Sequence, residues 1–136
     1  MKKRVLFVCI GNSCRSQMAE AFARAYGSDV VAPSSAGLSP ASGVAPKTVA
    51  ALREKNIGIE GQFPKDLDSV LHQPFDIVVN MSGFPLSIPG ARMLDWDVPD
   101  PIGQDDKFFR AVAAQIENLT MRLILELRAM AATDSG

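Results

Sequence analysis

One stretch near the amino terminus decides the fold, and it reads Val5-Leu6-Phe7-Val8-Cys9-Ile10-Gly11-Asn12-Ser13-Cys14-Arg15-Ser16. The run from Lys3 to Cys9 is short and rich in β-branched and aromatic residues, which is typical of a strand buried in a parallel sheet. After Cys9 the chain passes through Gly11 and Asn12, the two residue types that best tolerate positive φ angles, and we expect both to adopt them in a loop. Apolar and small side chains then recur at helical spacing over residues 16–26. The sequence therefore predicts a strand, a loop and a helix in direct succession.

The rest of the chain repeats this alternation. We expect further strands at 29–35, 75–81 and, as a short edge strand, 91–94, and further helices at 46–55 and 105–130, with a frayed tail after residue 132. Alternating strands and helices predict an α/β fold with a parallel sheet and right-handed crossovers. Ligands of such folds bind at the carboxyl ends of the strands, and Cys9 is the carboxyl end of the first one.

Length and composition limit the classes of protein. The 136 residues are enough for one domain with its own core, so we expect residues 1–136 to form a single domain. The net charge of −1 gives no indication of nucleic acid or of an acidic membrane surface as a partner. No stretch approaches the ~20 apolar residues of a membrane span, and the first apolar run is too short for a signal peptide. We expect a cytoplasmic protein.

The two cysteines of the chain, Cys9 and Cys14, lie in the same loop, and the single histidine, His72, is far along the sequence. A disulfide across so short a loop would add little stability. Two cysteines cannot complete a cysteine-only zinc site. We therefore expect no metal and no cofactor, and chemistry or redox sensing explains the pair better.

The loop between Cys9 and Arg15 has the features of an oxyanion site. Backbone N–H groups of such a loop, together with the first turn of the helix, form a nest for an anion. Arg15 can grip two oxygens of a tetrahedral oxyanion through its planar fork. The same surroundings favour the thiolate of Cys9, and Ser16 would donate a hydrogen bond to it or cap the helix. We expect Cys9 to be the nucleophile and the oxyanion to contact Ile10, Gly11, Asn12, Ser13, Cys14 and Ser16.

Residues 5–20, in which Gln17-Met18-Ala19-Glu20 continue this stretch, resemble the amino-terminal signature of the low-molecular-weight tyrosine phosphatases and the related arsenate reductases. Further matches follow at residues 35–37, 75–79 and 100–101, so the resemblance spans nearly the whole chain. It implies a three-layer fold in which helices flank a four-stranded parallel sheet.

The resemblance also implies a general acid and a supporting network. In this family the acid is the aspartate of an Asp-Pro pair, which is Asp100 here, and it protonates the leaving oxygen before activating water. Reductases of the family use Asn12, Glu20 and Ser35 in a polar network behind the loop, although the position of Glu20 equally fits a helix-surface residue. Lys65 stands where some relatives carry an aspartate, so a metal ion in that network is not expected.

The resemblance leaves the activity open. Thioredoxin-coupled reductases of the family need two further cysteines near the end of the third strand, and residues 80–89 contain none, so an internal three-cysteine relay is impossible. Ser13 and the Ser16–Glu20 segment are nevertheless closer to the reductases. Ile102-Gly103-Gln104 also replaces the aromatic residues that wall the phosphotyrosine slot, and Leu38 is the largest side chain in residues 37–43.

We interpret the sequence as a cysteine-dependent phosphatase that acts through a phosphocysteine, because the residues that hydrolysis requires are present. One alternative is an arsenate reductase recycled by an external small thiol or a glutaredoxin-like partner. The other is a non-catalytic oxyanion or phosphoprotein sensor that is switched by oxidation of Cys9 and Cys14. All three would bind phosphate, arsenate or a phosphorylated substrate at the same loop.

Overall fold

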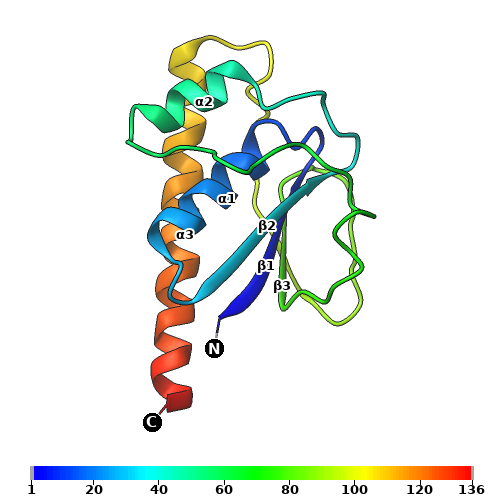
Figure 1. The fold of residues 1–136 in the computed structure, drawn as a ribbon, viewed down its shortest axis with the longest axis vertical. Helices are drawn as coiled ribbons and strands as arrows, with labels where there is room; N and C mark the ends of the chain where they lie inside the picture. Colours follow the sequence, from blue (N-terminus) through cyan, green and yellow to red (C-terminus); the bar gives the residue numbers. More distant parts are fainter. Residues whose placement is uncertain (1, 136) are drawn as a thin grey trace.

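The computed structural model describes residues 2–135. Its elements, in chain order, are β1 (Lys3–Cys9), α1 (Arg15–Tyr26), β2 (Val31–Gly37), α2 (Pro46–Arg53), β3 (Ile77–Asn80), β4 (Arg92–Asp95) and α3 (Asp106–Ser135). All strands are parallel and form one sheet in the order β2-β1-β3-β4. Figure 1 labels β1, β2 and β3 of this sheet. The predicted α/β fold with a four-stranded parallel sheet is confirmed.

Strand β1 lies inside the sheet and is buried on both faces because its alternate side chains enter two cores. Val5 and Phe7 face the core that α1, α2 and α3 cover. Leu6 and Val8 face a smaller core on the opposite side, which also holds Val70. Turns and loops rather than a helix close this second core, and Figure 1 shows them on the side of the sheet away from the helices. The three layers are therefore helices, sheet and turns.

Several of the predicted boundaries are wrong, and helix α2 ends at Arg53 rather than at residue 55. Strand β2 is shifted two residues toward the carboxyl terminus, because residues 28–30 form a turn in which Val30 and Val31 donate to the carbonyl of Gly27. Strand β3 is shorter than the predicted range 75–81. Helix α3 does not fray after residue 132 and continues to Ser135, and the hydroxyl of Thr133 donates to the carbonyl of Ala129 one turn earlier.

Helix α3 runs the length of the molecule and fixes the position of α1 (Figure 1). The helical spacing predicted for its apolar face is confirmed, because Phe109, Val112, Ile116 and Leu123 are all buried against the main core. Phe22 of α1 is fully buried in the same core. Helix α1, whose amino terminus ends the predicted oxyanion loop, therefore packs on α3. No helix in residues 2–135 is long and apolar enough to cross a membrane.

Candidate active site

The loop between β1 and α1 leaves several backbone donors without a partner among residues 2–135. The carbonyl groups of Cys9, Ile10, Gly11 and Ser13 all accept hydrogen bonds from the backbone of residues 38–45. In contrast, the N–H groups of residues 11–14 donate no hydrogen bond to any group in residues 2–135. Orphan N–H groups are rare in buried loops and call for an explanation. Because they belong to one tight loop at a helix amino terminus, they can bind the oxygens of an anion.

Asn12 fixes the shape of this loop. Its φ angle is 50°, in the left-handed region that asparagine tolerates, whereas Gly11, expected to share this feature, is not in that region. The side chain is fully buried. Its Nδ2 donates to Ser16 Oγ at 2.7 Å, and its Oδ1 accepts from the backbone of Lys65 at 3.0 Å. The carbonyl of Asn12 accepts from Gln17 Nε2 at 2.9 Å.

Gly37, the last residue of β2, lets the loop pack closely against the sheet. A Cβ atom at this position would lie 2.7 Å from the carbonyl oxygen of Ile10 and 2.9 Å from the backbone nitrogen of Asn12. Both neighbours are backbone atoms and cannot swing aside as a side chain would. The register pairs Gly37 directly with Cys9. Gly37 is therefore needed for the position of the loop relative to the first strand.

The substitution Gly37→Ala is expected to displace the loop and to weaken phosphate binding by about tenfold or more. It should also destabilise the protein by roughly 1–3 kcal/mol, as overpacking does. Calorimetric titration with phosphate and thermal unfolding measure the two effects. Gly43→Ala is the matched control, because a Cβ there meets no atom within 4 Å. Equal phosphate affinity in both variants would contradict the role of Gly37.

Cys9 lies at the carboxyl end of β1, and its Sγ is 2.9 Å from Ser16 Oγ. The hydroxyl of Ser16 already accepts a hydrogen bond from Asn12, so its own proton is free to point at the sulfur. Helix α1 has no side-chain capping hydrogen bond. Of the two roles left open for Ser16, the geometry thus favours hydrogen bonding to Cys9 over helix capping.

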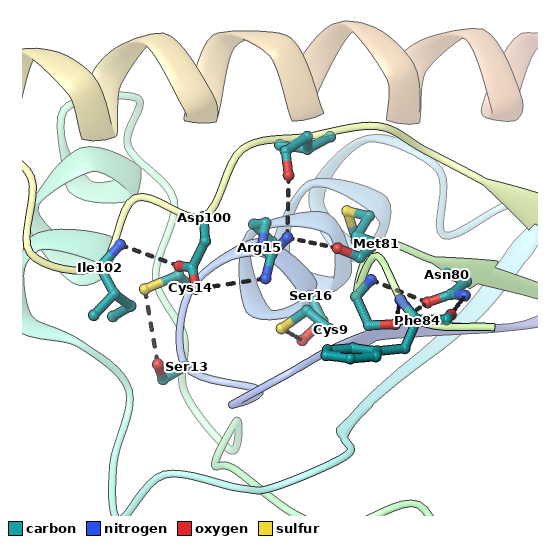
Figure 2. Close-up of polar contacts among 12 residues, drawn as sticks. Cys9, Ser13, Cys14, Arg15, Ser16, Asn80, Met81, Phe84, Asp100 and Ile102 are labelled. Atoms are coloured by element: carbon teal, nitrogen blue, oxygen red, sulfur yellow. Dashed lines mark hydrogen bonds and ion pairs between the residues drawn. The ribbon is translucent and has the colours of Figure 1, made fainter. Parts of the chain in front are cut away.

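Arg15 is buried, and backbone carbonyls from two distant segments orient it. Its Nη1 donates to the carbonyl of Met81 at 2.6 Å and to that of Val98 at 3.0 Å. Its Nη2 lies 3.7 Å from Oδ2 of Asp100. The other oxygen of Asp100 accepts from the backbone of Ile102 at 3.1 Å. Figure 2 shows the side chains of Asp100 and Arg15 directed toward each other.

The second cysteine of the loop is held as a thiol. Cys14 is 3% exposed, and its Sγ lies 3.7 Å from Ser13 Oγ. Burial raises the pKa of the Cys14 thiol above its ordinary value, and the nearby carboxylate of Asp100 adds to the effect. Cys14 therefore stays protonated at neutral pH.

Iodoacetamide at neutral pH is expected to alkylate Cys9 and to spare Cys14. Because the pKa of Cys14 is raised, its thiolate fraction grows only when the pH rises beyond the ordinary thiol range. Peptide mass mapping of Cys9→Ser and Cys14→Ser over a series of pH values measures each site alone. If Cys9→Ser is alkylated near pH 7 as fast as the unmodified chain, Cys14 rather than Cys9 is the reactive thiol.

The polar network predicted behind the loop contains a buried ion pair. Glu20 is 4% exposed, so it is not a helix-surface residue. Its Oε1 accepts from Ser35 Oγ at 2.6 Å, and its Oε2 lies 2.7 Å from Nη1 of Arg24. Arg24 is not among the residues predicted for this network.

Two glutamines, for which the sequence likewise predicts no role, connect this ion pair to the loop. Gln62 Oε1 accepts from Arg24 at 2.9 Å, and Gln62 Nε2 donates to Gln17 Oε1 at 2.8 Å. Gln17 in turn donates to the carbonyl of Asn12. Among the described residues, no group of three or more His, Cys, Asp or Glu side chains could hold a metal ion. The side-chain amides of Gln17 and Gln62 connect the Glu20–Arg24 ion pair to the loop.

A hollow of about 360 Å³ lies beside Arg15, between the loop after β3 and the segment after β4. The aromatic side chains of Phe84 and Trp96 line it, together with Asp95 and Asp97. From the sequence, aromatic residues that could wall the slot are sought only in 37–43 and after Asp100, and Trp96 is expected to pack beneath the acid loop rather than to contact substrate. The structure packs Trp96 on Phe7 and also places it in the lining of this hollow. Only the parallel pairing of β3 with β4 brings the two segments together.

The model of the low molecular weight phosphotyrosine protein phosphatase family matches residues 4–133. The chain belongs to this family. Within it, the glutaredoxin arsenate reductase of Synechocystis sp. is 35% identical over 130 residues, which cover 92% of this chain and 98% of the relative. The family resemblance of the sequence is therefore confirmed.

Solved structures similar to this chain include proteins named as arsenate reductases and proteins named as phosphatases. An arsenate reductase in the phosphate binding state superimposes with a TM-score of 0.84 at 35% identity, over 93% of this chain and 99% of the other. The YwlE arginine phosphatase from Geobacillus stearothermophilus gives a TM-score of 0.84 at 27% identity, over 96% of each chain. Membership in the low molecular weight phosphatase family is thus compatible with either activity.

Proposed function

We propose that this protein is a phosphatase that hydrolyses phosphomonoesters through a phosphocysteine on Cys9. The observation that carries the proposal is the position of Asp100, whose carboxylate lies 3.7 Å from Nη2 of Arg15 above the oxyanion loop. Hydrolysis needs a proton donor at this place, whereas binding of an oxyanion does not. The side chain of Asp100 is 45% exposed, so a substrate oxygen can reach it.

In the first step the phosphoryl oxygens accept hydrogen bonds from the N–H groups of residues 11–14 and from Nη2 of Arg15, the nitrogen that faces Asp100. The thiolate of Cys9 attacks phosphorus, forming the S–P bond, while the bond from phosphorus to the ester oxygen breaks. Protonated Asp100 transfers its proton to that oxygen, and the alcohol leaves.

In the second step Asp100 accepts a proton from water, whose oxygen attacks phosphorus. The S–P bond breaks, phosphate is released and Cys9 returns as a thiolate. The hydroxyl of Ser16, 2.9 Å from Sγ, stabilises the negative charge on the departing sulfur. The acid form of Asp100 is restored in the same step.

Arsenate reduction is the second candidate, and the names of the relatives favour it. Arsenate would bind the same N–H groups, and the thiolate of Cys9 would form an S–As bond while one As–O bond breaks and its oxygen, once protonated, leaves as water. A small external thiol would then attack Cys9 sulfur, releasing arsenite and leaving a mixed disulfide that a second thiol reduces. An external reductant is required because the chain has two cysteines and Cys14 is held as a thiol.

The substitution Asp100→Asn is expected to slow hydrolysis of phenyl phosphate by roughly a hundredfold or more, as loss of a general acid does. The effect on kcat/KM for para-nitrophenyl phosphate should be smaller, because kcat/KM reports formation of the phosphocysteine and nitrophenolate leaves without a proton. Steady-state kinetics on both esters measure the difference. Asp68→Asn, a change at an exposed carboxylate, is the matched control.

The same protein should be tested on arsenate with several small thiols and with a glutaredoxin. Arsenate reduction releases no phenoxide, so it should depend little on Asp100 and strongly on the thiol. Hydrolysis of phenyl phosphate that requires Asp100 supports the phosphatase. No hydrolysis of either ester, together with thiol-dependent formation of arsenite, would replace the phosphatase by the reductase.

A further inference from the structure

The hollow beside Arg15 is built from two aromatic walls and an acidic rim. Phe84, in the loop after β3, forms one wall, and Trp96, directly after β4, forms the other. Asp95 and Asp97 flank the tryptophan along the chain and also line the space. The volume of about 360 Å³ is at the lower end of that of small-ligand pockets. Because Arg15 belongs to the lining, the hollow adjoins the oxyanion loop.

A hydrogen-bonded turn holds Phe84 in place. The side-chain Nδ2 of Asn80 donates to the carbonyl of Phe84 at 2.7 Å, and the backbone N–H of Phe84 donates to Ser82 Oγ at 3.1 Å. Ser82 itself donates to Asn80 Oδ1 at 2.6 Å, and Gly83 adopts a φ angle of 81° to close the turn. Figure 2 shows the ring standing off this turn. The ring is 58% exposed although its backbone is fixed, so its face is open to a partner.

The opposite wall is anchored to the core. The ring of Trp96 packs against that of Phe7 with 5.9 Å between the centroids and an interplanar angle of 47°. The backbone N–H of Trp96 donates to the carbonyl of Asn80 at 3.0 Å. Both walls are therefore tied to Asn80 at the end of β3, and the space between them is preformed.

The charges of the hollow favour a cation. The carboxylates of Asp95 and Asp97 make no ion pair or hydrogen bond within residues 2–135. The guanidinium of Arg15 is already directed to two carbonyls and to Asp100, and under the proposed mechanism it faces the phosphoryl group. The unpaired charge of the hollow is therefore negative. A cation between two aromatic rings and two carboxylates gains both cation–π and Coulomb attraction.

We propose that this hollow binds the cationic side chain of an arginine or lysine in a peptide partner. On the proposed function, on which this assignment of the substrate rests, the basic residue flanks the phosphorylated residue of the substrate. The oxyanion loop then holds the phosphoryl group while the hollow holds the neighbouring positive charge. The enzyme would accordingly prefer phosphopeptides with a basic neighbour over neutral or acidic ones.

Trp96 is the single tryptophan of the chain, so its fluorescence reports occupancy of the hollow without any need for turnover. Nα-acetyl-arginine amide and its uncharged analogue Nα-acetyl-citrulline amide are the two probes, each titrated with phosphate present. The arginine compound should bind about fivefold or more tightly, as expected for cation–π and exposed ion-pair contacts together. In the double variant Asp95→Asn, Asp97→Asn the two affinities should become equal, whereas Asp68→Asn should keep the difference. Equal affinities in the unmodified chain would overturn the proposal.

Kinetics on paired phosphopeptides with arginine or citrulline beside the phosphorylated residue extend the test to the substrate. The ratio of kcat/KM for the two peptides is taken within each variant, so a general loss of activity cancels. The ratio should be about fivefold or more in the unmodified chain and near one in the double variant. A ratio near one in the unmodified enzyme, with hydrolysis intact, overturns the substrate assignment. Charge-selective fluorescence without hydrolysis of any ester supports the binding site and contradicts the phosphatase.

Discussion

Replacing Cys9 by serine is expected to lower the turnover of every phosphate ester by roughly 10⁴-fold or more, because the alcohol of serine does not ionise at neutral pH. The replaced sulfur stands at the end of a central strand, 2.9 Å from the Ser16 hydroxyl. The orphan N–H groups of residues 11–14 remain in the variant. Phosphate should therefore still bind, and calorimetric titration beside the kinetic assay separates the two effects.

The reciprocal variant Cys14→Ser decides which sulfur is the nucleophile. Its substitution removes a buried thiol that is not ionised, so hydrolysis should fall far less than in Cys9→Ser. Retained hydrolysis in Cys9→Ser, together with its loss in Cys14→Ser, would assign the chemistry to Cys14 and refute the mechanism.

The substitution Arg15→Lys is expected to reduce kcat/KM by about 10²- to 10³-fold although the positive charge is kept. The guanidinium is oriented by donating from one nitrogen to the carbonyls of Met81 and Val98, while its other terminal nitrogen faces Asp100. The ammonium group of lysine lacks the planar fork of the guanidinium. It cannot donate to the carbonyls of Met81 and Val98 and also present a donor on the side of Asp100. The loss should appear in kcat as well as in the affinity for phosphate.

Arg53→Lys is the matched control for this change, since Arg53 is exposed on α2. Circular dichroism of both variants tests whether the fold is retained. A folded Arg15→Lys enzyme with kcat/KM within tenfold of the unmodified chain would show that charge alone suffices and that the planar geometry is unimportant.

Local sequence predicted the centre of the fold well. Strand β1, the following loop and α1 occupy nearly the predicted residues, because a buried strand and an amphipathic helix are each specified within about ten neighbouring positions. The expectation that Asn12 would accept a positive φ angle is also confirmed, since it rests on the residue type itself. The shifted β2 shows where this reasoning fails, because pairing with β1 rather than propensity sets its limits.

The parts of the site that the sequence did not predict depend on contacts between distant segments. The carbonyls that orient Arg15 are 66 and 83 positions away along the chain. Gln62 reaches Gln17 and Arg24 from a turn that no periodic pattern identifies. Phe84 and Trp96 form one hollow only because β3 and β4 are parallel neighbours. A single sequence records the residue types at these positions but not their pairing.

Trapping the covalent intermediate tests the central claim most directly. The Asp100→Asn variant should form the phosphocysteine from para-nitrophenyl phosphate, whose leaving group needs no proton, and should hydrolyse it slowly because the base for water is missing. Rapid acid quenching, intact-mass measurement and peptide mapping then locate the phosphoryl group. The mechanism predicts one phosphoryl group on the peptide that contains Cys9, and none in Cys9→Ser. Hydrolysis of the ester without any phosphoryl group on Cys9 would contradict it.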